Sequence, residues 1–229
     1  MKIAIHQPQY LPWLGYFHKM MMADVFVFLD NVQFKKNEFQ NRNRIKTKDR
    51  VIWLTVPVIH RFPQLISEVM INNRENWRKK HLRTLEINYR KAPYFERFFP
   101  IFVEGLEKEW AYLSPLNVYF VEKIAEALAI EKRFVVASEL ESLPEGATDR
   151  LVAICRKLGG NTYISGAGGR GYLELTKFEK AGIKVIFQEF KHPVYPQLYG
   201  EFEPYLSVVD LLFNLGEESG KIILEGGKL

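Results

Sequence analysis

Short apolar runs alternate with longer amphipathic segments along most of this chain. The runs at residues 2–6, 24–29, 133–137, 162–165 and 183–189 are too short for helices and predict buried strands. Apolar residues recur at helical spacing between them, which predicts helices over 13–23, 74–90, 95–109, 115–128, 148–158, 174–181, 206–214 and 218–225. Because the chain begins with a strand, a helix and a strand, it predicts a parallel βαβ unit with residues 2–6 as a central strand.

These elements predict an α/β fold, with a mainly parallel sheet in a Rossmann-like, three-layer arrangement, of which a nucleotidyltransferase-like fold is one version. Residues 51–58 predict a further strand, at an edge because Pro57 lacks a donor. The polar residues 31–50 predict a functional loop with a short hairpin. Ser114 predicts the cap of the helix over 115–128, with Pro115 at its first position.

The chain length suits a single α/β domain over 1–229. The helical block 74–129 is either a subdomain inserted into it or a cover for one face of the sheet. The composition, 47% hydrophobic and 26% charged, is that of an ordinary globular protein.

The sequence predicts a cytoplasmic protein. No apolar run approaches the roughly 18–20 residues that span a bilayer, and the N-terminus lacks the features of a secretory signal. The single cysteine, Cys155, lies on an apolar helical face and is expected in the core rather than in catalysis. The oligomeric state and any cofactor stay open.

The net charge of +5 is unevenly distributed, with basic residues concentrated in 35–50 and 74–91. Such patches suit phosphates, whether on a nucleotide, on a nucleotide sugar or, as a weaker candidate, on nucleic acid. A solvated basic surface is the alternative.

The first candidate motif, HQPQYLPWLGYFHKM, directly follows the first predicted strand. Ligands bind at the carboxyl ends of strands in open α/β sheets, so His6 stands where a catalytic acid or base is expected. A structural histidine is the alternative. The neighbours expected to contact the substrate are Gln7, Gln9, Tyr10, Trp13 and Lys19.

The second candidate is the segment after the second strand. Asp30 stands where Rossmann-like folds hold a ribose hydroxyl, although the usual glycine fingerprint is absent and an Asp-Asn turn is an equal alternative. Gln33 follows as a further contact. Arg42 or Lys46 would grip a phosphate, unless both are merely solvated.

Two late loops complete the expected site. In ISGAGGRGYL, the expected anion cradle consists of Ser165, Gly166, Gly168, Gly169 and Arg170, with a tight strand-to-helix connection as the alternative.

The loop KHPVYPQLYGEF adds His192, a candidate acid–base partner of His6, together with Tyr195 and Gln197. No histidine spacing supports a metal site. We expect His6, Arg170 and His192 to meet in one cleft.

These motifs, with ADVFVFLDNVQFKKNEFQNRNRIK and FEPYLSVVDLLFNLG, resemble the WbqC-like protein family over nearly the whole chain. The resemblance implies a cytoplasmic protein linked with O-antigen and other surface polysaccharides, and the motif positions as its site. A more remote similarity is to HIGH-type nucleotidyltransferases. The HIGH motif itself is absent from this sequence, and only His6 is a candidate counterpart, of its first histidine.

The expected function is an enzyme that makes or modifies an activated amino sugar for surface polysaccharide, by acyl or aminoacyl transfer. The alternatives are a nucleotidyltransferase and a non-catalytic protein that binds a nucleotide sugar or nucleic acid.

Overall fold

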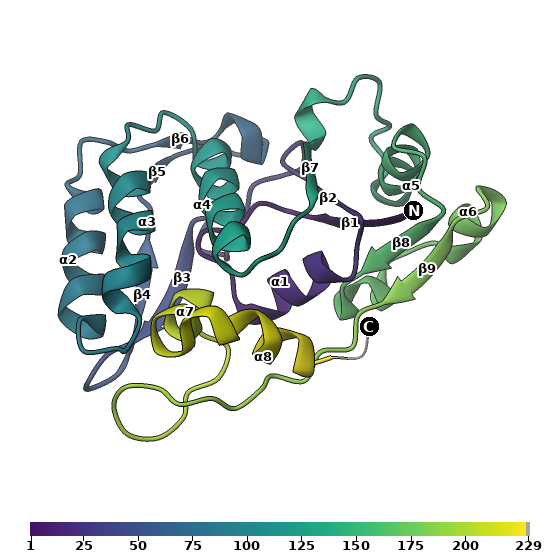
Figure 1. The fold of residues 1–229 in the computed structure, drawn as a ribbon. Helices are drawn as coiled ribbons and strands as arrows, with labels where there is room; N and C mark the ends of the chain where they lie inside the picture. The colour runs from purple at the N-terminus through teal and green to yellow at the C-terminus, as the bar shows by residue number, and fades with distance from the viewer. Residues whose placement is uncertain (228–229) are drawn as a thin grey trace.

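The computed structural model describes residues 1–227, and its core is a five-stranded parallel sheet in the order β7-β2-β1-β8-β9 (Figure 1). The strands are β1 (Lys2–His6), β2 (Val25–Phe28), β7 (Arg133–Val136), β8 (Thr162–Ser165) and β9 (Lys184–Phe187). Since β1 pairs with β2 on one side and with β8 on the other, the predicted central first strand is confirmed.

Helices cover both faces of this sheet. Ala4, Phe26 and Ile164 belong to one hydrophobic cluster, which they share with α1 (Leu14–Met21), α4 (Leu113–Ala127), α7 (Val208–Leu215) and α8 (Ser219–Glu225). Ile3, Val25 and Tyr163 point the other way, into a cluster with α5 (Ala147–Lys157) and α6 (Leu175–Lys180). Successive side chains of a strand point to opposite faces of the sheet, so each strand contributes residues to both hydrophobic clusters. The predicted three-layer α/β fold is confirmed.

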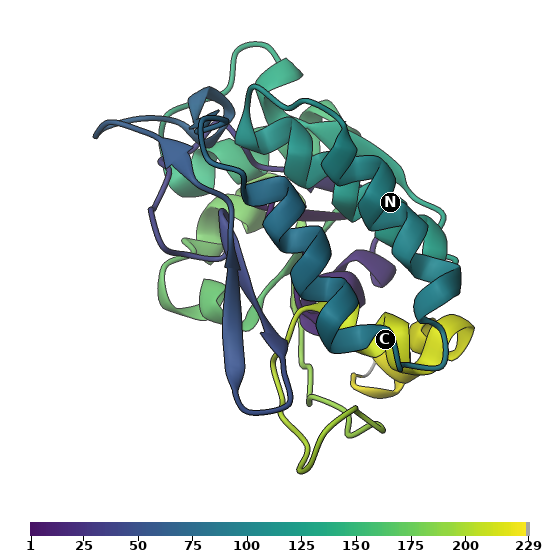
Figure 2. The same ribbon diagram turned by 90° about the vertical axis from the view of Figure 1, so that its left-hand side faces the viewer.

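Outside the sheet, β3 (Arg42–Lys46) and β4 (Val51–Thr55) form an antiparallel hairpin, which lies beside α2 (Trp77–Tyr89) (Figure 2). Only the first strand of the hairpin predicted within 31–50 lies in that range, because the second strand is β4. The single strand expected over 51–58 is wrong. It ends at Thr55, and β5 (Val58–Ile59) pairs instead with β6 (Met70–Ile71). Pro57 has no N–H with which to continue a ladder, so the strand divides there.

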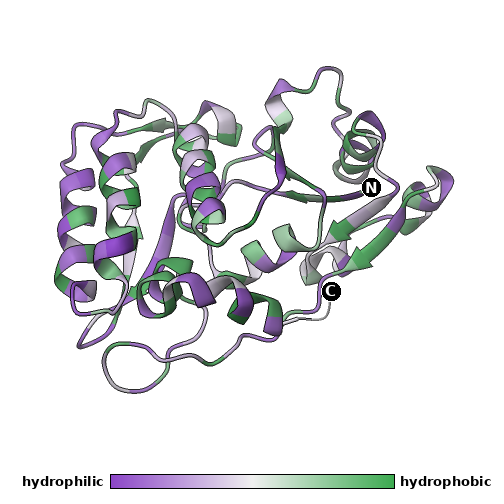
Figure 3. Cartoon of the chain, viewed as in Figure 1, coloured by the Kyte–Doolittle hydropathy of each residue, from purple (hydrophilic) through white to green (hydrophobic). Residues whose placement is uncertain are grey.

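The helical block contains α2, α3 (Phe95–Glu107) and α4, of which α2 packs on α3 and α3 on α4. Hydrophobic and hydrophilic residues occupy different sides of these helices (Figure 3). The buried residues of α2 recur every four positions, at Trp77, His81, Leu85 and Tyr89. No helix within residues 1–227 combines the length and the apolar character needed to cross a membrane.

The predicted start of the third helix of this block is wrong. The residue before α4 is Tyr112, and Ser114 lies in the first turn, where its hydroxyl donates to Asp30 Oδ2 at 3.2 Å. Pro115 is tolerated in that turn because the first amides of a helix have no partner within the helix.

His81 is a buried polar residue that links α2 to the N-terminal motif. Its Nδ1 lies 2.9 Å from the Tyr10 hydroxyl. Burial lowers the pKa of His81 from its ordinary 6.5 to about 4.

We expect this histidine to make the protein sensitive to acid. As the pH falls below 6.5, His81 of the unfolded chain binds a proton, whereas folded His81 does so only near 4. The folded state therefore loses about 3 kcal/mol across that interval. Urea denaturation at several pH values should show a shallower acid limb for His81→Gln. An unchanged slope in His81→Gln would contradict the assignment.

Candidate functional site

A cavity of about 560 Å³ opens at the carboxyl ends of β1, β2 and β8, and we call it the sheet-edge cavity. Its volume is within the range of about 300–1,000 Å³ that is common for small-molecule sites. Its walls include residues predicted from the sequence, namely His6, Gln7, Lys19, Gln33, Ser165, Gly166, Gly168 and Gly169. They also include residues that were not predicted, among them Lys35, Glu145, Arg150, Tyr163 and Tyr172.

Lys19 reaches this cavity from α1 and is only 3% exposed. Its Nζ donates to the Ile5 carbonyl oxygen at 2.7 Å, and none of the ion pairs within residues 1–227 includes it. A buried ammonium without a counter-charge is costly, and this burial lowers the pKa of Lys19 to about 7. An anion in the cavity would supply the missing charge and hold the amine in its protonated form.

His6 lies at the end of β1 and is half-buried. Its Nδ1 is 3.1 Å from the Gln7 carbonyl oxygen. Since that oxygen can only accept, Nδ1 carries the proton and Nε2 is left as an acceptor. Burial, followed by the charge of Lys19, lowers the pKa of His6 to about 3. The imidazole is therefore neutral at physiological pH and suited to accept a hydrogen bond from a ligand hydroxyl or amine.

Arg150 brings a second cation to the cavity from the first turns of α5. Its guanidinium donates to the carbonyl oxygens of Asn31 at 2.8 Å and Pro144 at 2.9 Å. Neutral partners leave its positive charge unbalanced, and the N-terminus of α5 adds a partial positive charge at Ala147. With Lys19 and Lys35 against Glu145, the cavity carries a net positive charge and suits an anion.

The glycine loop after β8 forms another wall. Ser165 is buried at the end of the strand, and the loop continues as a short turn over Ala167–Gly171. A Cβ atom on Gly169 would lie 2.1 Å from Ser165 Oγ, so this close approach requires glycine.

The expected convergence of His6, Arg170 and His192 is not found. Arg170 lies over the Phe187 ring at 4.5 Å and pairs with Glu189 at 3.5 Å, while the ring centroids of His192 and Tyr205 are 5.1 Å apart. Neither Arg170 nor His192 is among the residues that line the sheet-edge cavity.

The path of the chain after β9 explains the position of His192. Phe190 bridges to Gly227, and the Lys191 amide donates to the Gly226 carbonyl oxygen at 2.6 Å. The loop with His192 is therefore tied to the C-terminal segment, rather than folded back over the sheet edge.

The other predicted contact residues lie outside this cavity. The Gln9 side-chain oxygen is buried and has no hydrogen-bond partner within residues 1–227. The remaining predicted residues contact other side chains: Tyr10 with His81, Trp13 with Phe190, Arg42 over Trp53, Lys46 with Gln197, and Tyr195 with Asp210. All of these contacts are made within the protein, and the roles of the side chains in binding stay predictions.

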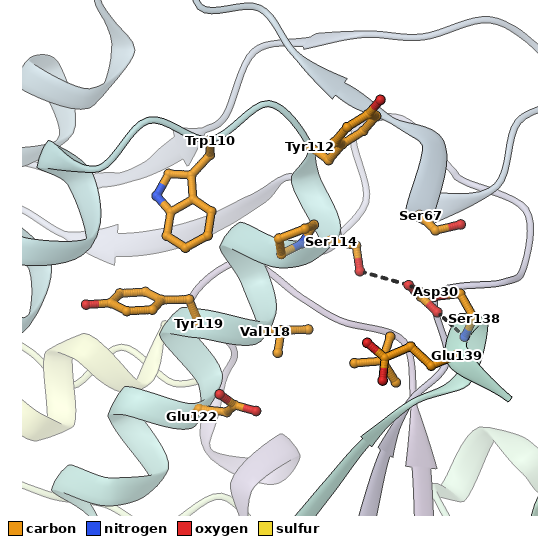
Figure 4. A pocket seen from close by; sticks show the side chains of 12 residues that line it. Asp30, Ser67, Trp110, Tyr112, Ser114, Val118, Tyr119, Glu122, Ser138 and Glu139 are labelled. Atoms are coloured by element: carbon orange, nitrogen blue, oxygen red, sulfur yellow. Dashed lines mark hydrogen bonds between the residues drawn. The ribbon is translucent and has the colours of Figure 1, made fainter.

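Asp30 lies at the end of β2 but lines a second cavity, of about 420 Å³, between α4 and the end of β7 (Figure 4). Its carboxylate accepts hydrogen bonds from the Ser138 amide and hydroxyl, both at 2.9 Å, and from Ser114. It thereby ties the start of α4 to the short 3₁₀ helix η2 (Ala137–Glu139).

Two kinds of lining residue were missed. Tyr163 precedes Ser165 by two positions on one strand, so the period of a strand was a usable signal. Arg150 and Tyr172 carry no such signal, because only the packing of α5 and of the glycine loop against the sheet brings them to the cavity. Within residues 1–227, no group of three or more His, Cys, Asp or Glu side chains is arranged to hold a metal ion.

The low pKa of Lys19 predicts selective acylation. Limited reaction with acetic anhydride, quantified by mass spectrometry across pH, should give Lys19 a half-maximal rate near pH 7. Lys177 is the matched control, since hydrogen bonds to Asp149 and Glu174 raise its pKa. A Lys19 midpoint at the ordinary lysine value of about 10.4 would refute the assignment.

Comparison with known proteins agrees with the resemblance of the motifs. A family model described as the WbqC-like protein family matches residues 7–222. The chain is 38% identical over 225 residues to "Uncharacterized protein Rv1507c" of Mycobacterium tuberculosis, a match that covers 95% of each chain. No solved structure matches this chain. Because the family match spans nearly its whole length, the chain belongs to the WbqC-like protein family.

Proposed function

We propose that this protein is a transferase that binds an activated sugar by its phosphates in the sheet-edge cavity. The observation that carries the proposal is Lys19, a buried cation without a carboxylate partner, which lines the cavity with His6 and Ser165. Because a buried charge needs a counter-charge, the cavity is suited to a ligand with a negative group. The setting in surface polysaccharide synthesis is the expectation that comes with the family resemblance.

The proposed reaction is acyl or aminoacyl transfer to an amino group on the sugar. In this scheme Lys19 and Arg150 hold the phosphates, and the loop from Ser165 to Gly169 supports them. The amine attacks the acyl carbonyl carbon, the bond from that carbon to the donor's leaving group breaks, and the proton lost by the amine passes to a base. His6 Nε2 is the candidate base, since Nδ1 is occupied by Gln7.

A second candidate is a non-catalytic protein that binds the same class of ligand. The observation in its favour is the pKa of His6, which at about 3 makes the free imidazole a weak base. Incubation with a nucleotide sugar and an acyl thioester separates the two, because only a transferase consumes both. Release of pyrophosphate from a nucleoside triphosphate would instead indicate nucleotidyl transfer.

Removal of the Lys19 charge should weaken phosphate recognition without harming the fold. In a thermal-shift experiment with UDP-N-acetylglucosamine, Lys19→Met should bind about tenfold to a hundredfold more weakly than wild type. Its melting temperature without ligand should be equal or higher, because a buried unpaired charge has been removed. Uridine, which lacks phosphates, and Lys48→Met in the exposed hairpin turn are the controls. Equal binding by Lys19→Met would refute the phosphate site.

The glycine loop permits a matched test within a single turn. Gly169→Ala should displace the Ser165 hydroxyl and weaken UDP-N-acetylglucosamine binding, because the added methyl would lie 2.1 Å from Ser165 Oγ. Gly171→Ala has no atom within 4 Å of the added carbon and should behave as wild type. Titration calorimetry gives both affinities, and equal values would exclude the loop from the binding site.

A further inference from the structure

The second cavity, which we call the acidic groove, shares no lining residue with the sheet-edge cavity. It lies between the N-terminal half of α4 and the end of β7. Figure 4 shows Trp110 and Tyr119 on one side of it and Asp30, Ser138 and Glu139 on the other. Its chemistry is therefore independent of the proposed phosphate site.

One wall of the acidic groove is aromatic. Trp110 and Tyr119 are half-buried, with ring centroids 5.2 Å apart. The Trp110 ring is fixed by a hydrogen bond of 2.7 Å from its Nε1 to the Gly105 carbonyl oxygen. Tyr112, at the start of α4, adds a third ring that is 44% exposed. Fixed and partly exposed rings of this kind stack on the apolar faces of sugars and attract cations.

The acidic groove also contains two carboxylates that have no partner in the described part of the chain. The carboxylates of Glu122 and Glu139 come from different elements, α4 and η2, and both residues are exposed. Neither forms a hydrogen bond or an ion pair among the interactions of residues 1–227, whereas Asp30 is already occupied by Ser114 and Ser138. Among residues 1–227, no Lys, Arg or His lines the groove.

A nearby contact shows how one of these rings behaves toward a cation. Lys108 Nζ lies 4.2 Å from the centroid of the Tyr119 ring, although Lys108 also pairs with Glu104. The ring of Tyr119 thus already attracts an ammonium group from outside the groove.

We propose that the acidic groove is a second ligand site, for a small hydroxylated compound that carries a protonated amine, such as an amino sugar. The amine would lie between Glu122 and Glu139, and the apolar face of the ligand would stack on Trp110. A neutral sugar of the same shape lacks the ion pair, and an anion is repelled by three carboxylates.

The two cavities adjoin in the chain. Leu29 lines the sheet-edge cavity and the next residue, Asp30, lines the acidic groove. Two hydrogen bonds hold the residue that follows, Asn31: Arg150 donates to its carbonyl oxygen at 2.8 Å, and its side chain donates to the Ala137 carbonyl oxygen at 3.2 Å. A protein with one cationic and one anionic cavity on neighbouring sides of a braced segment can hold two ligands of opposite charge.

The test uses glucosamine as the probe and glucose as its neutral analogue. Binding is followed by NMR through the indole N–H signal of Trp110, which is assigned among the four tryptophans with Trp110→Phe. Glucosamine should shift this signal saturably, and glucose should bind at least about fivefold more weakly. Glu122→Gln should weaken glucosamine binding by a similar factor. Equal binding of the two sugars, or no saturable shift, would overturn the proposal.

Matched variants distinguish binding at the acidic groove from a general effect of the protein's charge. Glu126→Gln lies on the same helix, outside the groove and paired with Lys123, and should leave glucosamine binding unchanged. Lys19→Met should also leave it unchanged, so a failure of the phosphate site and a failure of the amine site are distinguishable. If Glu126→Gln weakened binding as much as Glu122→Gln, the effect would be one of overall charge and the groove assignment would be wrong.

Discussion

β1 is hydrogen-bonded along both of its edges, to β2 from Ile3–Val25 to His6–Phe28 and to β8 from Lys2–Thr162 to Ala4–Ile164. Because helices cover both faces as well, its side chains have no access to solvent except where the strand ends. His6 is the residue at that end, and the parallel register brings Ser165 of β8 and the loop after β2 to the same edge. The sheet-edge cavity thus follows from the parallel pairing, and its polar lining from the residues that terminate each strand.

In this arrangement, burial of the Lys19 ammonium group costs free energy. The position of Lys19 on α1 directs the amine to the Ile5 carbonyl oxygen beneath the edge, where the side chain is buried and no ion pair within residues 1–227 includes it. Burial and, second to it, this charge lower the pKa of His6. Groups whose pKa values are shifted by burial in a cleft concentrate at functional sites, and ion-pair networks are the other common cause of such shifts. Here the absence of Lys19 from the ion pairs of residues 1–227 favours the functional interpretation.

A second polar cluster has a structural explanation. Asp210 on α7 accepts hydrogen bonds from Tyr89 at 2.7 Å and from Tyr195 at 3.0 Å, and all three residues are buried. Lys46 donates to Gln197 and to the Glu201 carbonyl oxygen, which joins the β3–β4 hairpin to the loop after β9. The aromatic and polar residues of the C-terminal motif therefore connect α2, the hairpin and α7. Hydrogen bonds of this kind satisfy buried hydroxyls.

The sequence by itself determined the α/β class, the central first strand, most helices and the cluster of His6, Gln7 and Ser165 at strand ends. These features depend on local periodicity and on the rule that parallel strands share a carboxyl edge, both of which operate within short segments. Tertiary structure alone decided that His192 lies away from the cavity, since the pairing of Phe190 with Gly227 joins residues far apart in the chain. It alone directed Arg170 to Phe187 and Glu189 rather than into the cavity. It alone brought Arg150 to the cavity, left Lys19 without a counter-charge and placed Asp30 in the acidic groove. Burial and long-range pairing set these outcomes, and neither is encoded in the pattern of any one segment.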